Sequence, residues 1–163
     1  MKIIQASKIQ LPIVRDLAFR IWPSAYGEIL SQAQLNYMLD KFYSLEALTE
    51  QLEERKHIFL LVENDGKQLG FASYESNIDN YKTKIHKIYV LPETQGKGFG
   101  VQFINEIEKR AQEANNKILF LNVNRFNKAQ YFYKKLGFEI AYEEDIEIGN
   151  GYLMEDFVME KKI

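Results

Sequence analysis

The sequence predicts an α/β fold built around a largely antiparallel sheet. Apolar patterns first suggest one strand and several helices, then a run of strands, and finally strands mixed with helices. Two glycine-rich turns, at Asp65-Gly66 and Gly149-Asn150-Gly151, lie between strand-like segments. Strict alternation of strand and helix, which a doubly wound sheet requires, is missing. At 163 residues, 46 % of them apolar, the chain fits one domain, 1–163, with a mixed sheet of about seven strands flanked by helices.

The first third of the chain is mainly helical. Apolar residues repeat with a helical period after Pro12, which suits a first helical turn, and Trp22-Pro23 is expected to end that helix. Ser31–Gln34 forms a capping-box pattern, and Ser44 is a second N-cap candidate. The expected elements are therefore a strand at Lys2–Ala6 and helices beginning near Pro12, Ser31 and Ser44.

Strand patterns begin at His57. Strands are expected at Ile58–Glu63, Lys67–Glu75, Tyr81–Val90, Ile118–Val123, Phe138–Ile148 and Tyr152–Glu160, with helices at Gly98–Asn115 and Asn127–Leu136. The near-continuous apolar run Ile118–Val123 predicts a strand buried on both faces. Gly137 stands where a left-handed helix C-cap belongs.

Composition excludes several classes of function. A net charge of −2 argues against a general binder of nucleic acid or anionic membranes. With no Cys and two His, we expect neither a disulfide nor a metal site. Met1–Ser7 lacks the apolar run of a signal peptide, and Ile58–Val62 is too short to span a bilayer. A cytoplasmic protein is expected.

The segment Gln95-Gly96-Lys97-Gly98-Phe99-Gly100 has the features of a phosphate-binding loop. Glycine permits positive φ and close approach of a ligand to the backbone. Amides at a helix N-terminus attract an anion, and Lys97 adds positive charge. The glycine spacing matches neither a P-loop nor a dinucleotide fingerprint. The alternative is a glycine-rich turn that binds nothing.

Two motifs together resemble the GNAT superfamily of N-acetyltransferases. The family has Gln/Arg-x-x-Gly-x-Gly/Ala after a strand ending in Val-x-Pro, which here is Ile88–Gly100. Its second motif, Ala-x-x-Phe-Tyr-x-x-x-Gly-Phe, is here Ala129–Phe138. The resemblance covers nearly the whole chain and implies a single-domain GNAT-like fold that uses acetyl-CoA. The tail Gly151–Glu160 and the region around Trp22 and Tyr26 look like the bacterial branch of spermidine/spermine acetyltransferases.

The resemblance also implies the contacts with coenzyme A. Backbone groups of Ile88, Tyr89 and Val90 would bind the pantetheine arm, and the Val90 amide would polarise the thioester carbonyl. The pyrophosphate would lie on the amides of Gln95, Gly96, Lys97, Gly98, Phe99, Gly100 and Val101. Asn127 either contacts the cofactor or caps a helix, with Asn124 as a second candidate contact. Lys134 either touches a cofactor phosphate or is a solvated helix residue.

Acetyl transfer to an amine requires a neutral amine, a stabilised oxyanion and a proton for the leaving thiolate. A phenol with a pKa near ~10 can protonate a thiolate whose conjugate acid is near ~8.5. Tyr133, in the family's tyrosine position, is the candidate acid, and its alternative role is packing. His86 is the candidate base because its pKa near ~6.5 suits that task. Glu75 is the next candidate, and a chain of waters is the third possibility.

The acceptor is less well defined than the donor. Acidic residues on the expected last hairpin, which are Glu143, Glu144, Asp145 and Glu147, favour a small cationic, polyamine-like amine, unless they are simply solvated. Trp22 and Tyr26 either line the acceptor pocket or belong to the core. The alternatives are acetylation of a protein N-terminus or lysine, a silent CoA-binding regulatory domain, and a structural domain. The resemblance is compatible with a homodimer.

Overall fold

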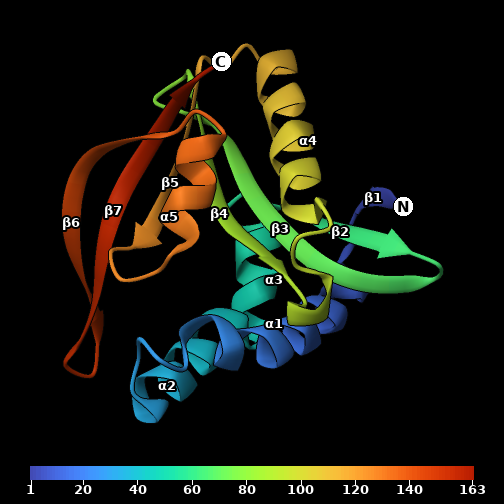
Figure 1. The fold of residues 1–163 in the computed structure, drawn as a ribbon. Helices are drawn as coiled ribbons and strands as arrows, with labels where there is room; N and C mark the ends of the chain where they lie inside the picture. The colour runs from blue at the N-terminus through green and yellow to red at the C-terminus, as the bar shows by residue number, and fades with distance from the viewer. The chain divides into compact units, whose positions relative to one another are not determined.

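A computed structural model describes residues 1–163, and Figure 1 labels its elements. The chain has an α/β fold with one seven-stranded sheet, in the order β1-β2-β3-β4-β5-β7-β6. Its residues group into two compact units, which we describe separately. The first unit contains Met1–Glu75 and His86–Ile107, and the second contains Ser76–Ile85 and Glu108–Ile163.

The order of elements agrees with the predicted one. In chain order they are β1 (Lys2–Gln5), α1 (Leu11–Tyr26), α2 (Gln32–Tyr43), α3 (Leu45–Glu53), β2 (Ile58–Asn64), β3 (Lys67–Ile78), β4 (Lys82–Val90), α4 (Phe99–Glu113), β5 (Ile118–Asn124), α5 (Ala129–Lys135), β6 (Glu139–Gly149) and β7 (Tyr152–Lys162). No helix combines the length and the apolar character needed to cross a bilayer.

The end of α1 differs from the prediction. Trp22-Pro23 was expected to stop the helix, but α1 continues through Pro23 to Tyr26. A proline costs a helix one backbone hydrogen bond, and its φ is still helical. One turn on, the Tyr26 ring packs on the Trp22 ring with centroids 4.6 Å apart. Such contacts between residues four apart stabilise a helix by about 0.2–0.5 kcal/mol, which offsets only part of the roughly 3 kcal/mol cost of an interior proline.

Serine caps define the starts of the next two helices, as predicted. The Ser31 hydroxyl accepts from the Gln34 amide at 3.1 Å, and the Ser44 hydroxyl accepts from the Ala47 amide at 3.1 Å. The helices α1, α2 and α3 pack together and bury their apolar stripes. The core side chains of this unit include Val14, Leu17, Ile21, Leu35, Leu39, Leu48, Phe59, Leu61 and Phe71.

Strands β1 to β3 form an antiparallel meander within the first unit. The turn between β2 and β3 has φ of 51° at Asp65 and 74° at Gly66, as the predicted Asp-Gly hairpin requires. Strand β3 runs to Ile78, three residues beyond the expected end at Glu75. The left-handed residues of the following turn include Asp79 and Asn80.

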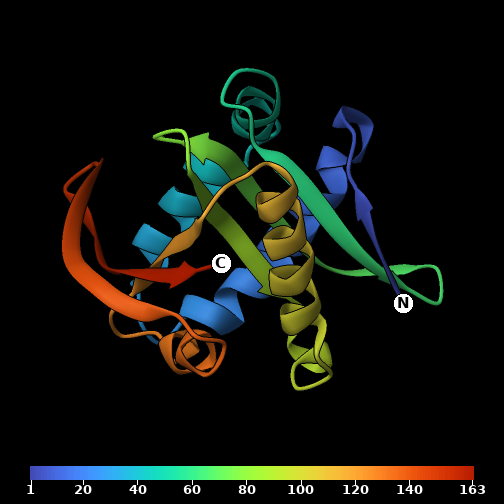
Figure 2. The ribbon, with the colours of Figure 1, turned by 90° about the horizontal axis from the view of Figure 1, so that it is seen from above.

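The second unit contains the parallel pair β4–β5 and the long hairpin β6–β7, drawn in orange to red in Figure 2. The prediction that β5 is buried on both faces was wrong. Its Leu119, Leu121 and Val123 are buried, while the alternate residues are partly exposed. On that second face, the Phe120 ring lies near the ammonium groups of Lys82 and Lys84, each 5.8 Å from the ring centroid. Phe120 is thus partly exposed beside charged groups.

Candidate functional site

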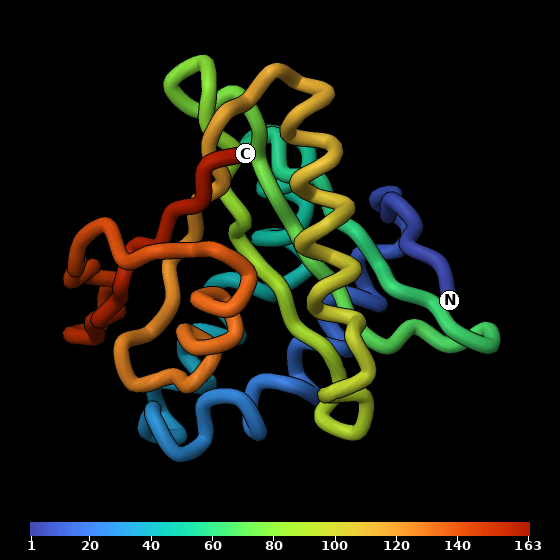
Figure 3. The backbone as a smooth tube through the Cα atoms, turned by 45° about the horizontal axis from the view of Figure 1, so that its top comes forward, coloured from blue at the N-terminus to red at the C-terminus, as the bar shows by residue number.

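The loop between β4 and α4 has the backbone conformation that the glycine pattern predicts, and Figure 3 traces it. Gly96 has φ +80° and Gly98 has φ +85°, values that L side chains rarely adopt. A Cβ added at either glycine would have no neighbour within 4 Å, so both face open space. The Gly98 carbonyl accepts from the Gln102 amide at 3.1 Å, which places Gly98 at the start of α4.

The start of α4 offers unpaired backbone donors. The first four amides of any α-helix have no acceptor within that helix, and they lie at the positive end of its dipole. α4 is 15 residues long, so it develops this dipole. Gln95, Gly96, Lys97 and Gly98 are exposed, whereas Phe99 is buried and anchors the helix start. Within the loop, the Gln95 amide donates to the Pro92 carbonyl at 3.2 Å and the Lys97 amide donates to the Thr94 carbonyl at 3.4 Å. The groups offered to an anion are therefore the first-turn amides of α4 and the Lys97 ammonium group.

The strand leading into this loop is closely packed against β3. A Cβ at Gly70 would lie 2.6 Å from the Tyr89 carbonyl oxygen and 3.1 Å from the Val90 Cα. The Leu91 amide also donates to the Leu69 carbonyl at 2.9 Å. On its other side, β4 pairs with β5 only from Lys82 to Ile85. Ile88, Tyr89 and Val90 therefore lie beyond the end of that ladder.

Three titratable side chains of the first unit lie together. His86 Nε2 is 3.0 Å from Glu75 Oε1, and His57 Nε2 is 3.7 Å from the same oxygen. The two imidazole rings stack with centroids 3.8 Å apart and planes 15° apart. The structure thus brings the predicted base candidates His86 and Glu75 into contact. His57 was not predicted, because no local pattern shows that it pairs with a residue 29 positions away.

An aromatic cluster occupies another part of the first unit. Trp22, Tyr26 and Tyr89 have ring centroids within 6.2 Å of one another, and the Tyr26 and Tyr89 hydroxyls are 2.9 Å apart. The Tyr43 ring is 5.3 Å from Trp22, and burial raises the pKa of its phenol well above the usual range. Trp22 is buried and Tyr26 is partly exposed, so Trp22 is a core residue.

In the second unit, α5 holds Tyr133 firmly. The side chain is 7 % exposed, and its ring packs on Phe132 and Phe138 at centroid distances of 5.2 and 5.8 Å. Gly137, with φ +96°, ends the helix as predicted. The Phe138 amide then donates to the Tyr133 carbonyl at 3.1 Å. This C-cap fixes the backbone around Tyr133.

The other predicted cofactor contacts of this unit lie on α5 or just before it. Asn127 Oδ1 accepts from the Ala129 amide at 2.9 Å, a turn contact one residue before Lys128, which is the N-cap residue of α5. Asn124 Oδ1 accepts from the Phe126 amide at 2.9 Å. Lys134 is exposed, with its ammonium group 5.3 Å from the centroid of the Tyr131 ring. These contacts order the turn between β5 and α5.

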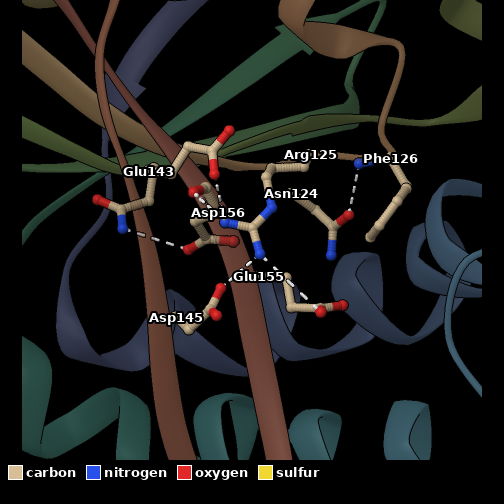
Figure 4. A network of polar contacts seen from close by, with 8 residues as sticks. Asn124, Arg125, Phe126, Glu143, Asp145, Glu155 and Asp156 are labelled. Atoms are coloured by element: carbon tan, nitrogen blue, oxygen red, sulfur yellow. Dashed lines mark hydrogen bonds and ion pairs between the residues drawn. The ribbon is translucent and has the colours of Figure 1, made fainter.

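Arg125, which directly follows β5, is the centre of a polar network with residues of the β6–β7 hairpin (Figure 4). It forms ion pairs with Asp145, with Glu143 at 3.6 Å and with Glu155 at 3.9 Å. The hydrogen bond to Asp145 raises the pKa of Arg125. The charge of the acidic residues predicted on this hairpin is therefore partly neutralised by Arg125, whose role the sequence pattern did not reveal.

Asp156 is a buried carboxyl that sequence reasoning missed. It is 2 % exposed, and burial raises its pKa despite a 3.2 Å hydrogen bond from Asn122. The same Asn122 amide donates to Glu144 at 3.3 Å, and the Glu144 charge raises the pKa of Asp156 further. The cross-strand register of Glu144 with Asp156 explains their proximity.

Comparisons with known proteins identify the family of this chain. Residues 28–161 match the family model of the acetyltransferase (GNAT) domain. A solved structure of PaiA N-acetyltransferase from Thermoplasma acidophilum in complex with coenzyme A is similar, with a TM-score of 0.83 and 27 % sequence identity. The match covers 99 % of this chain and 98 % of that one.

Two curated relatives match part of the chain. An uncharacterized N-acetyltransferase of Methanocaldococcus jannaschii is 38 % identical over 50 % of this chain and 38 % of its own length. A [ribosomal protein bS18]-alanine N-acetyltransferase of Haemophilus influenzae is 30 % identical over 59 % of this chain and 64 % of its own length. The matched region is thus less than two thirds of either relative.

Proposed function

Because this chain belongs to the GNAT family of acetyltransferases, we propose that it transfers an acetyl group from acetyl-CoA to a primary amine. The observation that carries the proposal is the loop before α4. Its two glycines at positive φ face open space at the start of a 15-residue helix. This arrangement suits a pyrophosphate, because exposed amides, the helix dipole and Lys97 all favour an anion there.

The rest of the cofactor would follow β4. The pantetheine arm would bind backbone groups of Ile88, Tyr89 and Val90 as an added strand does. This placement is supported by the register of β4 with β5, which ends at Ile85. Tight packing of Gly70 against Tyr89 and Val90 keeps that edge rigid. The pyrophosphate would then lie on the amides from Gln95 to Val101.

The proposed chemistry is direct attack. The amine nitrogen attacks the thioester carbonyl carbon, and the Val90 amide stabilises the oxyanion. The intermediate collapses with cleavage of the C–S bond, and the leaving thiolate takes a proton from the Tyr133 hydroxyl. The proton lost by the attacking nitrogen restores the phenol, directly or through water. Fixed packing of Tyr133 between Phe132 and Phe138 supports a positioned acid.

Deprotonation of the incoming ammonium group is assigned to His86, with Glu75 as its partner. In the tautomer assigned by this proposal, the His86 Nε2–H group donates to Glu75 Oε1 at 3.0 Å, and Nδ1 is the basic nitrogen of the ring. The carboxylate stabilises the imidazolium that forms when His86 takes a proton. Glu75 thus has an orienting role in this mechanism, in addition to being the second base candidate.

We propose a small cationic, polyamine-like amine as the acceptor. Support comes from the acidic β6–β7 hairpin, where Arg125 offsets only part of the charge. The alternative acceptor is the N-terminal amine of a protein, and the name of the H. influenzae relative favours it. A peptide acceptor would use the same donor chemistry.

An acceptor panel tests this proposal. The purified full chain is given acetyl-CoA with polyamines, amino sugars and peptides bearing a free N-terminal alanine, and thiol release is followed. Turnover with polyamines supports the cationic acceptor, and turnover with peptides alone selects the protein acceptor. Tight binding of acetyl-CoA without turnover on any amine would identify a silent CoA-binding domain and overturn the enzymatic proposal.

A further inference from the structure

The two histidines of the chain, His57 and His86, form a side-chain cluster with Glu75 in the first unit. We propose that His57, Glu75 and His86 bind one divalent transition-metal ion of the Zn²⁺ class. The ion is not a cofactor of the acetyl transfer. It competes with protons for the imidazole nitrogens and therefore acts as an inhibitor.

The three donor atoms are close enough to share an ion. One donor from each residue lies within 4.8 Å of the other two. Glu75 Oε1 is 3.0 Å from His86 Nε2 and 3.7 Å from His57 Nε2. Zinc bonds of about 2.0–2.2 Å at tetrahedral angles place neighbouring donors roughly 3.4 Å apart. The observed distances lie on either side of that value.

The cluster is built on strands rather than on a mobile loop. Glu75 is on β3 and His86 is on β4, while His57 directly precedes β2. The antiparallel register pairs Ile58 with Tyr74, so one more step places His57 opposite Glu75. A site on paired strands holds its ligands more precisely than a site on loops.

Burial of the cluster is graded, which suits an ion that enters from solvent. The side chain of His57 is 8 % exposed, that of His86 is 19 % exposed and that of Glu75 is 29 % exposed. Glu75 and His86 provide an entry path, and His57 lies at the inner end. Two imidazoles and one carboxylate are a ligand set that zinc accepts, with a fourth position left for water.

Ion binding requires the two imidazole rings to change their orientation. The lone pair of an imidazole nitrogen lies in the ring plane, whereas the two rings are stacked with planes 15° apart. Both lone pairs point at one ion only if the rings turn out of the stack. The stacked arrangement is therefore the ion-free state, and binding breaks it. Both imidazole nitrogens must be unprotonated to bind the ion, so affinity falls as the pH is lowered.

Direct binding measurements test the site. Untagged, chelator-treated full-length protein is titrated with ZnCl₂ by calorimetry, and with CoCl₂ while the visible absorption is recorded. We expect one ion per chain, with cobalt bands typical of a four-coordinate site. The variants His57→Gln and Glu75→Gln are each expected to weaken binding by at least about 100-fold. The matched control is Glu63→Gln on β2, outside the cluster, which should bind zinc as the wild type does.

Two results would overturn the site: no binding of Zn²⁺ up to millimolar concentration, or equal affinity in His57→Gln and Glu75→Gln. If one variant does not fold by circular dichroism, the other decides, together with the cobalt spectrum of the wild-type protein. Inhibition rests on the proposed function and is measured separately, as the ratio of turnover with and without ZnCl₂. Failure of all turnover would leave the binding result unaffected. Binding without inhibition would remove the inhibitory role alone.

Discussion

At the scale of single residues, the chemistry depends on side chains that packing holds in place. Tyr133 is 7 % exposed and its ring packs on two other aromatic rings, which restricts the orientation of its phenol. On the same helix, Tyr131 is 58 % exposed. This contrast provides an acid candidate and a matched control two residues apart.

Replacing Tyr133 with Phe removes the proposed proton donor and keeps the packing ring. We expect kcat to fall by about 10²- to 10⁴-fold, the usual contribution of a positioned acid. The KM for acetyl-CoA should change little, because the phenol acts on the leaving thiolate. Steady-state kinetics with the best acceptor measure both constants. Tyr131→Phe should be unchanged, and wild-type turnover in Tyr133→Phe would remove the acid role.

Asp156 predicts a pH-dependent effect on stability. Burial raises its native pKa above the unfolded value of about 3.9, so the folded state binds this proton more tightly. The ionised carboxylate therefore costs stability above the raised pKa, and the cost vanishes below about pH 3.9. Asp156→Asn is neutral at every pH and still offers an oxygen to Asn122.

Thermal unfolding at several pH values measures this effect. The variant should gain in Tm relative to wild type at pH 7, and the gain should shrink as the pH falls through the raised pKa. The matched control is Glu147→Gln, an exposed carboxylate on the same hairpin. A variant that is less stable than wild type by a constant amount at all pH values would contradict this account.

At the scale of elements, the loop between β4 and α4 is the part on which cofactor binding is proposed to depend. Gly98→Ala forces a residue with a Cβ into φ +85°, which costs about 1–2 kcal/mol. The chain contains a matched control, because Gly66 in the β2–β3 turn has φ +74° and equally open surroundings. Gly66→Ala should lose similar stability.

Affinity for CoA separates the two alanine variants. Only Gly98→Ala should bind CoA more weakly, by about tenfold or more, because only that strain displaces amides of the proposed pyrophosphate site. Calorimetry measures the affinity, and denaturant unfolding measures the stability. Equal CoA affinity in both variants would place the pyrophosphate elsewhere.

The β6–β7 hairpin gives a prediction about the acceptor. Arg125→Met removes the cation that pairs with Glu143, Asp145 and Glu155 and keeps an unbranched side chain. The hairpin becomes more acidic, so the KM for a cationic acceptor should fall, by a factor that shrinks in high salt. The KM values at low and high ionic strength test this. A salt-independent rise in KM would argue against an electrostatic role for the hairpin.

At the scale of the whole molecule, ligand binding should raise the free energy of unfolding. A ligand that binds only the folded state at 100 times its Kd adds about 2.7 kcal/mol. For a chain of 163 residues, this corresponds to roughly 5–11 °C in Tm. We expect CoA to produce such a shift, and thermal unfolding with and without CoA measures it. Adenosine is the control ligand without a pyrophosphate, and an equal shift with adenosine would contradict binding through the loop.

Much of this fold follows from local signals in the sequence. The predicted element order and family are confirmed, because capping serines, the Asp65-Gly66 turn and Gly137 each act within a few residues. Two predictions failed, namely the end of α1 and the burial of β5 on both faces. Helix α1 passes Pro23, and beyond the proline Tyr26 packs on Trp22 and its hydroxyl contacts that of Tyr89, 63 residues further on. One face of β5 is partly exposed, and there the ammonium groups of Lys82 and Lys84 on the neighbouring strand lie near the Phe120 ring.

The sequence by itself determined the order of elements and the glycine loop that is proposed to bind the acetyl donor. Those features depend on backbone conformation and short spacing, which a linear pattern contains. Only the tertiary structure decided which side chains share a site. Strand register brings His57 to Glu75 and His86, brings Glu144 to Asp156, and lets Arg125 pair with acidic residues of the hairpin. Residues far apart in the chain meet through pairing and burial, and no local pattern records which ones.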